Sequence, residues 1–339
     1  MIDPTQPQSY DYELPYPPVP KRSEFAFGDM VFQLFRTPGG RDFGLRLWMW
    51  VTLGYSAIFL VMLPLVAGPY MDFIMAAVEM ESIDGEVSSE EFGEFFGGMF
   101  AFMGVALVFL LAIWALIASG EAALHRRIFR GEEAARIPLR FGRDELRVMG
   151  AQFLLYLIFI GILFGAMILT VLTLFIGGLV IIPGAIVFSI LLLLMFCSAS
   201  ALSVKDRTFR FSESKHVTKN RRGLIFGAYA VIYIVSAVIL SIIQYGALFA
   251  FLGTMDLSTL ATEAGSETAQ LEQMIESFNN PLVMLGIVLT TILYAAVTAL
   301  LYLLYAGIGA SGLLWYLRDR QLPPTQWELA AQHYQPPQN

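Results

Sequence analysis

The sequence predicts an all-α polytopic membrane protein with six transmembrane helices in three hairpins, each hairpin preceded by a short interfacial helix. Three observations predict this fold class. The 339 residues are 57% hydrophobic and only 14% charged, whereas soluble domains are about 25% charged. Six stretches are long and apolar enough to cross the hydrocarbon core as helices, which takes about 20 residues. All 21 Lys and Arg residues lie in segments that alternate sides of these stretches.

The six apolar stretches contain no Asp, Glu, Lys, Arg or His. In chain order they run 47–68, 99–119, 151–175, 183–203, 223–252 and 281–317. An uncharged link joins the third to the fourth and predicts a tight turn, whereas long acidic loops join the first to the second and the fifth to the sixth. The sixth stretch is longer than one crossing requires, so it must tilt, bend or project. Its glycines Gly307, Gly309 and Gly312 would permit a bend, and small residues in a membrane helix also mark close packing.

The charge distribution predicts the orientation. Basic residues precede the first stretch, link the second to the third and the fourth to the fifth, and follow the sixth, while the two long loops on the other side hold acids and no bases. Cytoplasmic segments carry the excess of Lys and Arg, so both termini are predicted to be cytoplasmic. The chain then divides into a disordered Pro- and Tyr-rich tail (1–23), a six-helix membrane domain (24–317) and a C-terminal tail (318–339).

A similar short segment precedes each hairpin, which indicates a repeat-built bundle. These lead-in segments, residues 25–28, 139–142 and 209–212, read apolar-x-Phe-small and are followed by Asp or Glu, which favour the positive end of a helix dipole. In the first copy, Met30, Val31 and Leu34 lie on one helical face beside Arg36, a composition typical of a helix in the interface plane. A plain connector is the alternative interpretation.

Basic residues cluster around the second and third lead-ins. We expect them to form a belt that contacts anionic phospholipid headgroups. The candidates are Arg126, Arg127, Arg130, Arg140, Arg143, Lys215, Lys219, Arg221 and Arg222.

Three patterns resemble metal-binding or nucleotide-binding sites, but each is better explained as a feature of helices or loops. Glu121 and His125 share a helix face, but two ligands are too few for a metal, and they read as the polar end of a helix. The acidic loop around 79–94 lacks the spacing of an EF-hand. The glycine motif at 307–312 lies in an apolar helix and not after a strand, so it does not predict a nucleotide site. No catalytic, cofactor or metal residues are predicted.

One helical face of the sixth stretch carries hydroxyl groups, from Tyr294, Thr298, Tyr302 and Tyr305. Hydrogen bonds between helices are one interpretation. A groove for a lipid or another amphiphile is the other.

The lead-in motifs, the six spans and the Arg-rich links together resemble uncharacterised bacterial membrane proteins related to the glycerophosphoryl diester phosphodiesterase membrane domain. The resemblance rests on Phe25 to Asp29, His125-Arg126 with Gly131-Glu132, Leu139 to Arg143 and Phe209 to Glu213. In the enzymes that name this family, a separate soluble barrel carries out catalysis. The resemblance therefore implies a membrane module without the hydrolase.

The predicted function is that of a non-enzymatic protein of the bacterial inner membrane, acting as a scaffold, accessory subunit or lipid-organising module. A carrier or flippase-like protein for an amphiphile is the alternative. The expected partners are anionic membrane lipids and other membrane proteins, with no nucleic acid.

Overall fold

The computed structural model describes residues 27–37, 40–81, 89–132, 136–173, 177–219, 221–252 and 280–321. All regular structure in these ranges is helical, and six helices are long and apolar enough to cross a membrane. The all-α polytopic prediction is therefore confirmed. The predicted tail at 1–23, the loops at 82–88 and 253–279, and residues 322–339 of the predicted C-terminal tail (318–339) lie outside the described residues, whereas residues 318–321 belong to a helix.

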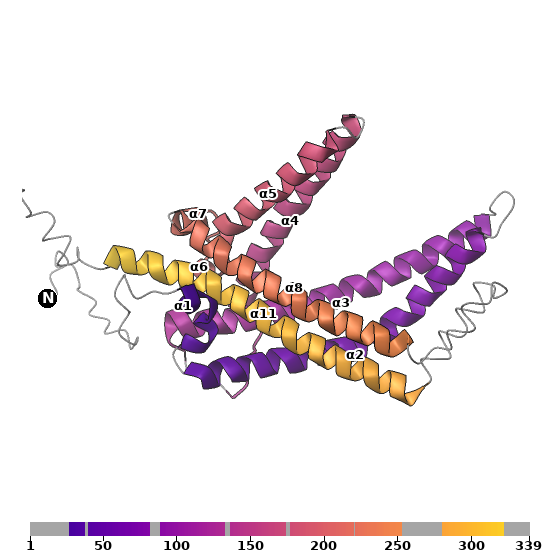
Figure 1. Ribbon diagram of the computed structural model, residues 1–339, viewed down its shortest axis with the longest axis horizontal. Coiled ribbons are helices and arrows are strands. Elements are labelled where there is room, and N and C mark those ends of the chain that lie inside the picture. The colour runs from indigo at the N-terminus through magenta and orange to yellow at the C-terminus, as the bar shows by residue number, and fades with distance from the viewer. Residues whose placement is uncertain are drawn as a thin grey trace, which may run out of the picture.

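The long helices form three hairpins (Figure 1). Their members are α2 (Gly40–Glu81), α3 (Ser89–Arg130), α4 (Arg143–Leu172), α5 (Gly178–Phe196), α8 (Arg222–Leu252) and α11 (Pro281–Gln321). The fourth span continues through a bend at Cys197–Ser198 into the short helix α6 (Ala199–Lys205). The uncharged link between α4 and α5, predicted to be a tight turn, includes residues 174–176, which lie outside the described ranges. After it, Gly178 is buried, and an added Cβ there would lie 2.8 Å from Thr170 Cγ2.

The hairpins meet at one end of the molecule and diverge from it (Figure 1). We call this end the hub; it contains the short helices, the C-terminal part of α3, the N-terminal parts of α2, α4 and α8, and the C-terminal half of α11. Fully buried side chains concentrate there, including Leu47, Leu124, Ile225, Ile308 and Leu313. Away from the hub the hairpins expose large apolar side chains, such as Leu172, Leu179 and Phe249. Such surface is stable in lipid and not in water.

Phe25 and Ala26 of the first lead-in lie outside the described residues; from Phe27 on, the chain forms α1 (Phe27–Val31) and the short 3-10 helix η2 (Gln33–Arg36), which pack on α11. Its apolar face does not lie on a bilayer surface, because Met30 and Leu34 are fully buried in the hub core. The interpretation of this copy as an interface-plane helix is therefore wrong. An apolar helical face has the same sequence pattern whether lipid or protein covers it.

The other two lead-ins differ from the first. In the second, residues 139–142 run straight into α4, and residues 136–142 form no separate helix. In the third, α7 (Ser214–Thr218) packs on α5 and α11 before α8 begins. The motif therefore positions the start of a hairpin without requiring a separate helix each time.

The glycines of the sixth span serve packing. Helix α11 runs without a break from Pro281 to Gln321. At Gly309, an added Cβ would collide with the backbone carbonyl oxygen of Cys197, and at Gly312 it would lie 3.1 Å from Ser198 Oγ. Ser198 Oγ also donates a 2.8 Å hydrogen bond to the carbonyl of Gly309. The glycines thus allow α11 to approach the α5–α6 bend closely.

Candidate functional site: buried polar groups in the hub

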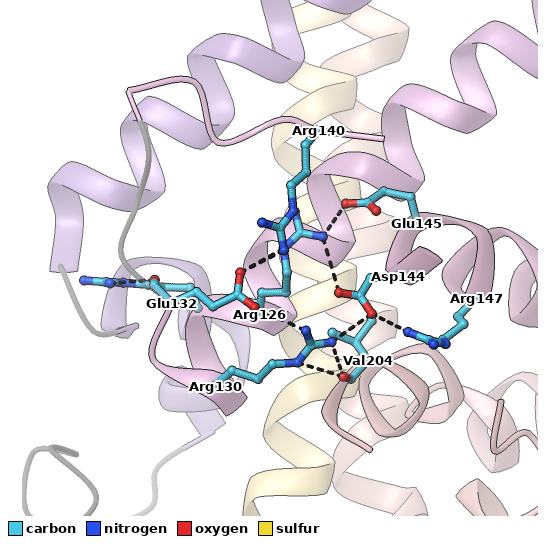
Figure 2. A network of polar contacts seen from close by, with 9 residues as sticks. Arg126, Arg130, Glu132, Arg140, Asp144, Glu145, Arg147 and Val204 are labelled. Carbon is cyan, nitrogen blue, oxygen red and sulfur yellow. Dashed lines mark hydrogen bonds and ion pairs between the residues drawn. The ribbon is translucent and has the colours of Figure 1, made fainter. Parts of the chain in front are cut away.

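A network of ion pairs joins the end of α3 to the start of α4 and the end of α6 (Figure 2). We call it the ionic junction; it consists of Arg126, Arg130, Glu132, Arg140, Asp144, Glu145 and Arg147. Arg126 lies at its centre, paired with Glu145 and 3.9 Å from Asp144. Asp144 also pairs with Arg130 at 2.8 Å and Arg147 at 2.6 Å. Glu132 lies 3.2 Å from Arg130 and 2.9 Å from Arg140.

Helix ends explain why these charges gather here. Asp144 and Glu145 occupy the first turn of α4, where unpaired backbone N–H groups attract anions. Arg130 closes α3, where unpaired carbonyls attract cations. Its Nε also donates a 3.0 Å hydrogen bond to the carbonyl of Val204 near the end of α6. The junction therefore places favourable charges at the end of α3 and the start of α4, and supplies a hydrogen bond to a carbonyl near the end of α6.

Burial separates the junction from the predicted headgroup belt. The side chain of Arg126 is 4% exposed and that of Glu145 is 1% exposed. Arg126 thus contacts protein carboxylates and has no surface to offer a headgroup, and Arg130 points into the same network (Figure 2). The predicted lipid contacts for these two residues do not fit the structure.

The other predicted belt residues lie nearer the surface. Arg127 lies 5.8 Å from the ring centroid of Phe43 in α2. Arg221 stacks on the ring of Trp315 in α11 at 3.7 Å, and Arg222 is half-buried. The remaining four are exposed: Arg140, Arg143, Lys215 and Lys219.

A second set of polar groups lies along the contact of α3 with α4 and α6. The carboxylate of Glu121 accepts hydrogen bonds from Ser200 Oγ and from Gln152 Nε2, the latter at 2.6 Å. Gln152 Oε1 in turn accepts from Trp114 Nε1 at 2.5 Å. We call Trp114, Gln152, Glu121 and Ser200 the polar chain. Sequence reasoning missed Gln152 and Ser200, although a Gln inside an apolar span is a signal of polar contact.

One turn beyond Glu121, His125 lies inside the hub and not at a solvated helix end. It is 1% exposed, and its Nε2 lies 3.4 Å from the carbonyl oxygen of Ala306 in α11. In the part of the chain that the structure describes, no three His, Cys, Asp or Glu side chains gather as possible metal ligands.

The structure divides the predicted hydroxyl face of α11. Thr298 is buried, Tyr305 stacks on Tyr229 with ring centroids 5.3 Å apart, and the ring of Tyr294 lies 6.5 Å from that of Phe59. Only Tyr302 of the four is exposed, at 39%. The face therefore contributes mainly to helix packing, and no observation favours an amphiphile groove along it.

Comparison with known proteins returned no relative: no family model, no curated protein and no solved structure matches the chain.

Proposed function

We propose that this chain is a non-enzymatic membrane protein that organises anionic lipid around its hub. The observation that carries the proposal is a pair of exposed Phe side chains, each flanked by arginines, on the second and third lead-ins. We call these residues the basic aromatic band: Arg140, Phe141, Arg143, Arg207, Phe209 and Arg210.

The band has the composition of an interfacial surface. Phe141 is 60% exposed and Phe209 is 50% exposed, and exposed aromatic side chains beside cations gain affinity from apolar burial and from attraction to anionic headgroups. Phe209 is held in place, because its ring contacts α4 at Gly150 and lies parallel to Phe211, which stacks on Phe196 at 4.3 Å. Arg210 donates a 2.7 Å hydrogen bond to Glu213, and this contact raises the pKa of Arg210. It therefore stays charged.

The ionic junction supports this role indirectly. It pairs Arg126 and Arg130 with carboxylates inside the protein. Arg140, which pairs with Glu132, and Arg143 are both exposed, with Phe141 between them. The diverging hairpins present apolar side chains to lipid on either side. Together they fit a module that holds headgroups at the hub and acyl chains beside its arms.

We further propose a bacterial inner membrane location with the hub on the cytoplasmic side. The positive-inside distribution supports this orientation, and anionic lipids give that leaflet a negative surface. The lead-in motifs also support a relation to the membrane module of glycerophosphoryl diester phosphodiesterase proteins, without the hydrolase.

Removing the charges of the band should weaken lipid retention. Each basic residue near an anionic surface contributes about 1 kcal/mol, so Arg140→Gln with Arg143→Gln should lose about 2 kcal/mol, or roughly 30-fold in affinity. The measurement is native mass spectrometry of phosphatidylglycerol retained by the purified protein over a series of salt concentrations. Wild-type retention should fall more steeply with salt than that of the variant.

The matched control is Arg41→Gln with Arg46→Gln, which removes the same charge from two exposed positions near the start of α2. It should retain more lipid than the band variant. Equal retention in wild type and band variant at every salt concentration would reject the proposal. An equal loss in both double variants would show that net charge, and not the band, holds the lipid.

A further inference from the structure

Glu121 differs from the other acidic residues that the hub covers. The buried or half-buried acids of the described residues are Asp29, Glu121, Glu132, Asp144, Glu145 and Asp206. Five of them form ion pairs with Arg or Lys. Glu121 forms none within the described ranges, and its two hydrogen-bond partners, Ser200 and Gln152, are neutral.

His125 supplies a second, independent observation. It is 1% exposed, and its Nδ1 makes no hydrogen bond in the described structure. It follows Glu121 by one helical turn, so the two side chains lie on the same face of α3. Glu121 is partly buried, and a proton on its carboxyl would remove a charge that has no positive partner within the described ranges. A proton, unlike a metal ion or a small-molecule ligand, can bind at this site without a cavity.

We propose that Glu121 and His125 form a proton-binding site inside the hub, and that the polar chain transmits its occupancy to Trp114. Uptake forms one O–H bond on the Glu121 carboxyl, with the proton taken from hydronium and water released. A proton on the carboxyl turns one acceptor oxygen into a donor. The contacts of Glu121 with Gln152 and Ser200 must then rearrange, and with them the contact of α3 with α4.

The groups around the site define the pH window of a test. Helix α3 contributes Arg126, α8 contributes Tyr229, and Cys197 lies beside Tyr229. Helix α4 contributes a hydrogen bond from Gln152, α6 contributes one from Ser200, and α11 contributes the carbonyl of Ala306. Tyr and Cys ordinarily titrate above pH 8 and Arg above pH 12, so these neighbours do not account for a change in the Trp114 signal below about pH 8.

Tryptophan fluorescence of the full chain in detergent micelles tests the proposal. The Trp114 contribution, obtained as the difference between wild type and Trp114→Phe, should change with pH through one midpoint below about pH 8. Glu121→Gln should abolish that titration, and His125→Gln should shift its midpoint. His216→Gln is the control, because His216 is an exposed histidine on α7, and it should leave the titration unchanged.

Two results would overturn the proposal: a Trp114 signal that does not change with pH, or a titration that persists in Glu121→Gln. If Glu121→Gln does not fold, the same fluorescence titration is made on Gln152→Met. This variant keeps Glu121 and removes the hydrogen bonds that connect Glu121 to Trp114 through Gln152. Loss of the titration in Gln152→Met supports the site, and an unchanged titration contradicts it. This outcome is independent of lipid retention, because none of these residues belongs to the basic aromatic band.

Discussion

Replacing Arg126 with Met is expected to lower the free energy of unfolding by about 3–5 kcal/mol, because it leaves a buried carboxylate uncompensated. That carboxylate belongs to Glu145, which is 1% exposed and has Arg126 as its ion-pair partner. Asp144 would keep Arg130 and Arg147, so the loss falls mainly on Glu145. The measurement is equilibrium unfolding in mixed detergent micelles.

A second substitution identifies the cause. Adding Glu145→Gln to Arg126→Met removes the uncompensated charge and should restore much of the lost stability. The control is Arg140→Met, which removes an exposed arginine paired with the same junction, and exposed pairs contribute only about 0–1 kcal/mol. If Arg126→Met and Arg140→Met destabilise the protein equally, the junction is not a buried ionic network.

Replacing Gly309 with Ala should also destabilise the fold strongly. A Cβ there would approach the backbone oxygen of Cys197 more closely than real Cβ atoms do, and a backbone atom cannot rotate away. Helix α11 must therefore move off the α5–α6 bend, which also breaks the hydrogen bond from Ser198. Overpacking costs about 1–3 kcal/mol, and more where the backbone must shift.

The same helix offers a matched control. At Gly286 an added Cβ meets no atom within 4 Å, so Gly286→Ala should be neutral or stabilising, by up to about 1 kcal/mol from helix propensity. Opposite effects of the two Gly→Ala changes, measured as melting temperature in detergent, would confirm close packing at Gly309. Similar effects would indicate that α11 tolerates a larger separation.

The spans could be predicted because hydropathy over 20 residues is a local property of the chain. The apolar stretch at 151–175, for example, lies almost entirely within α4. The continuation of the fourth span as α6 also follows this pattern, since the apolar stretch extends to residue 203 and α6 ends at Lys205. What hydropathy does not show is how far the helices project beyond the hydrocarbon. Helix α3, for example, continues past the apolar stretch that ends at residue 119 and includes Glu121 and His125.

The ionic junction could be predicted only in part. Dipole reasoning placed Asp144 at a helix start, and positive charge was expected near the end of α3. Their pairing was missed, because Arg126 and Glu145 are 19 positions apart along the chain and meet only when α4 packs against α3. The sequence alone therefore does not distinguish buried from exposed members of the nine basic candidates. In the folded chain, Arg126 is buried and Arg143 is exposed.

The first lead-in shows a related ambiguity. Met30 and Leu34 share an apolar helical face, and both lipid and protein can cover such a face. In this fold protein covers the face, because the small residue Gly307 of α11 lets the backbone at Leu34 approach that helix. This requires knowing that positions 34 and 307, which are 307 − 34 = 273 positions apart, are neighbours, and periodicity does not reveal it.

The side of the membrane on which the hub lies decides which leaflet the basic aromatic band can meet. Single cysteines introduced in a Cys197→Ala background, and exposed to an impermeant thiol reagent in intact spheroplasts, measure it directly. Ser212 in the third lead-in is exposed and suits labelling, whereas Ser214 is buried; Ser88 and Ser266 lie in the two acidic loops, outside the described residues. Labelling at Ser88 and Ser266, with Ser212 labelled only after lysis, is the predicted result. Labelling of Ser212 in intact cells would place the hub outside and contradict the proposed contact with the anionic cytoplasmic leaflet.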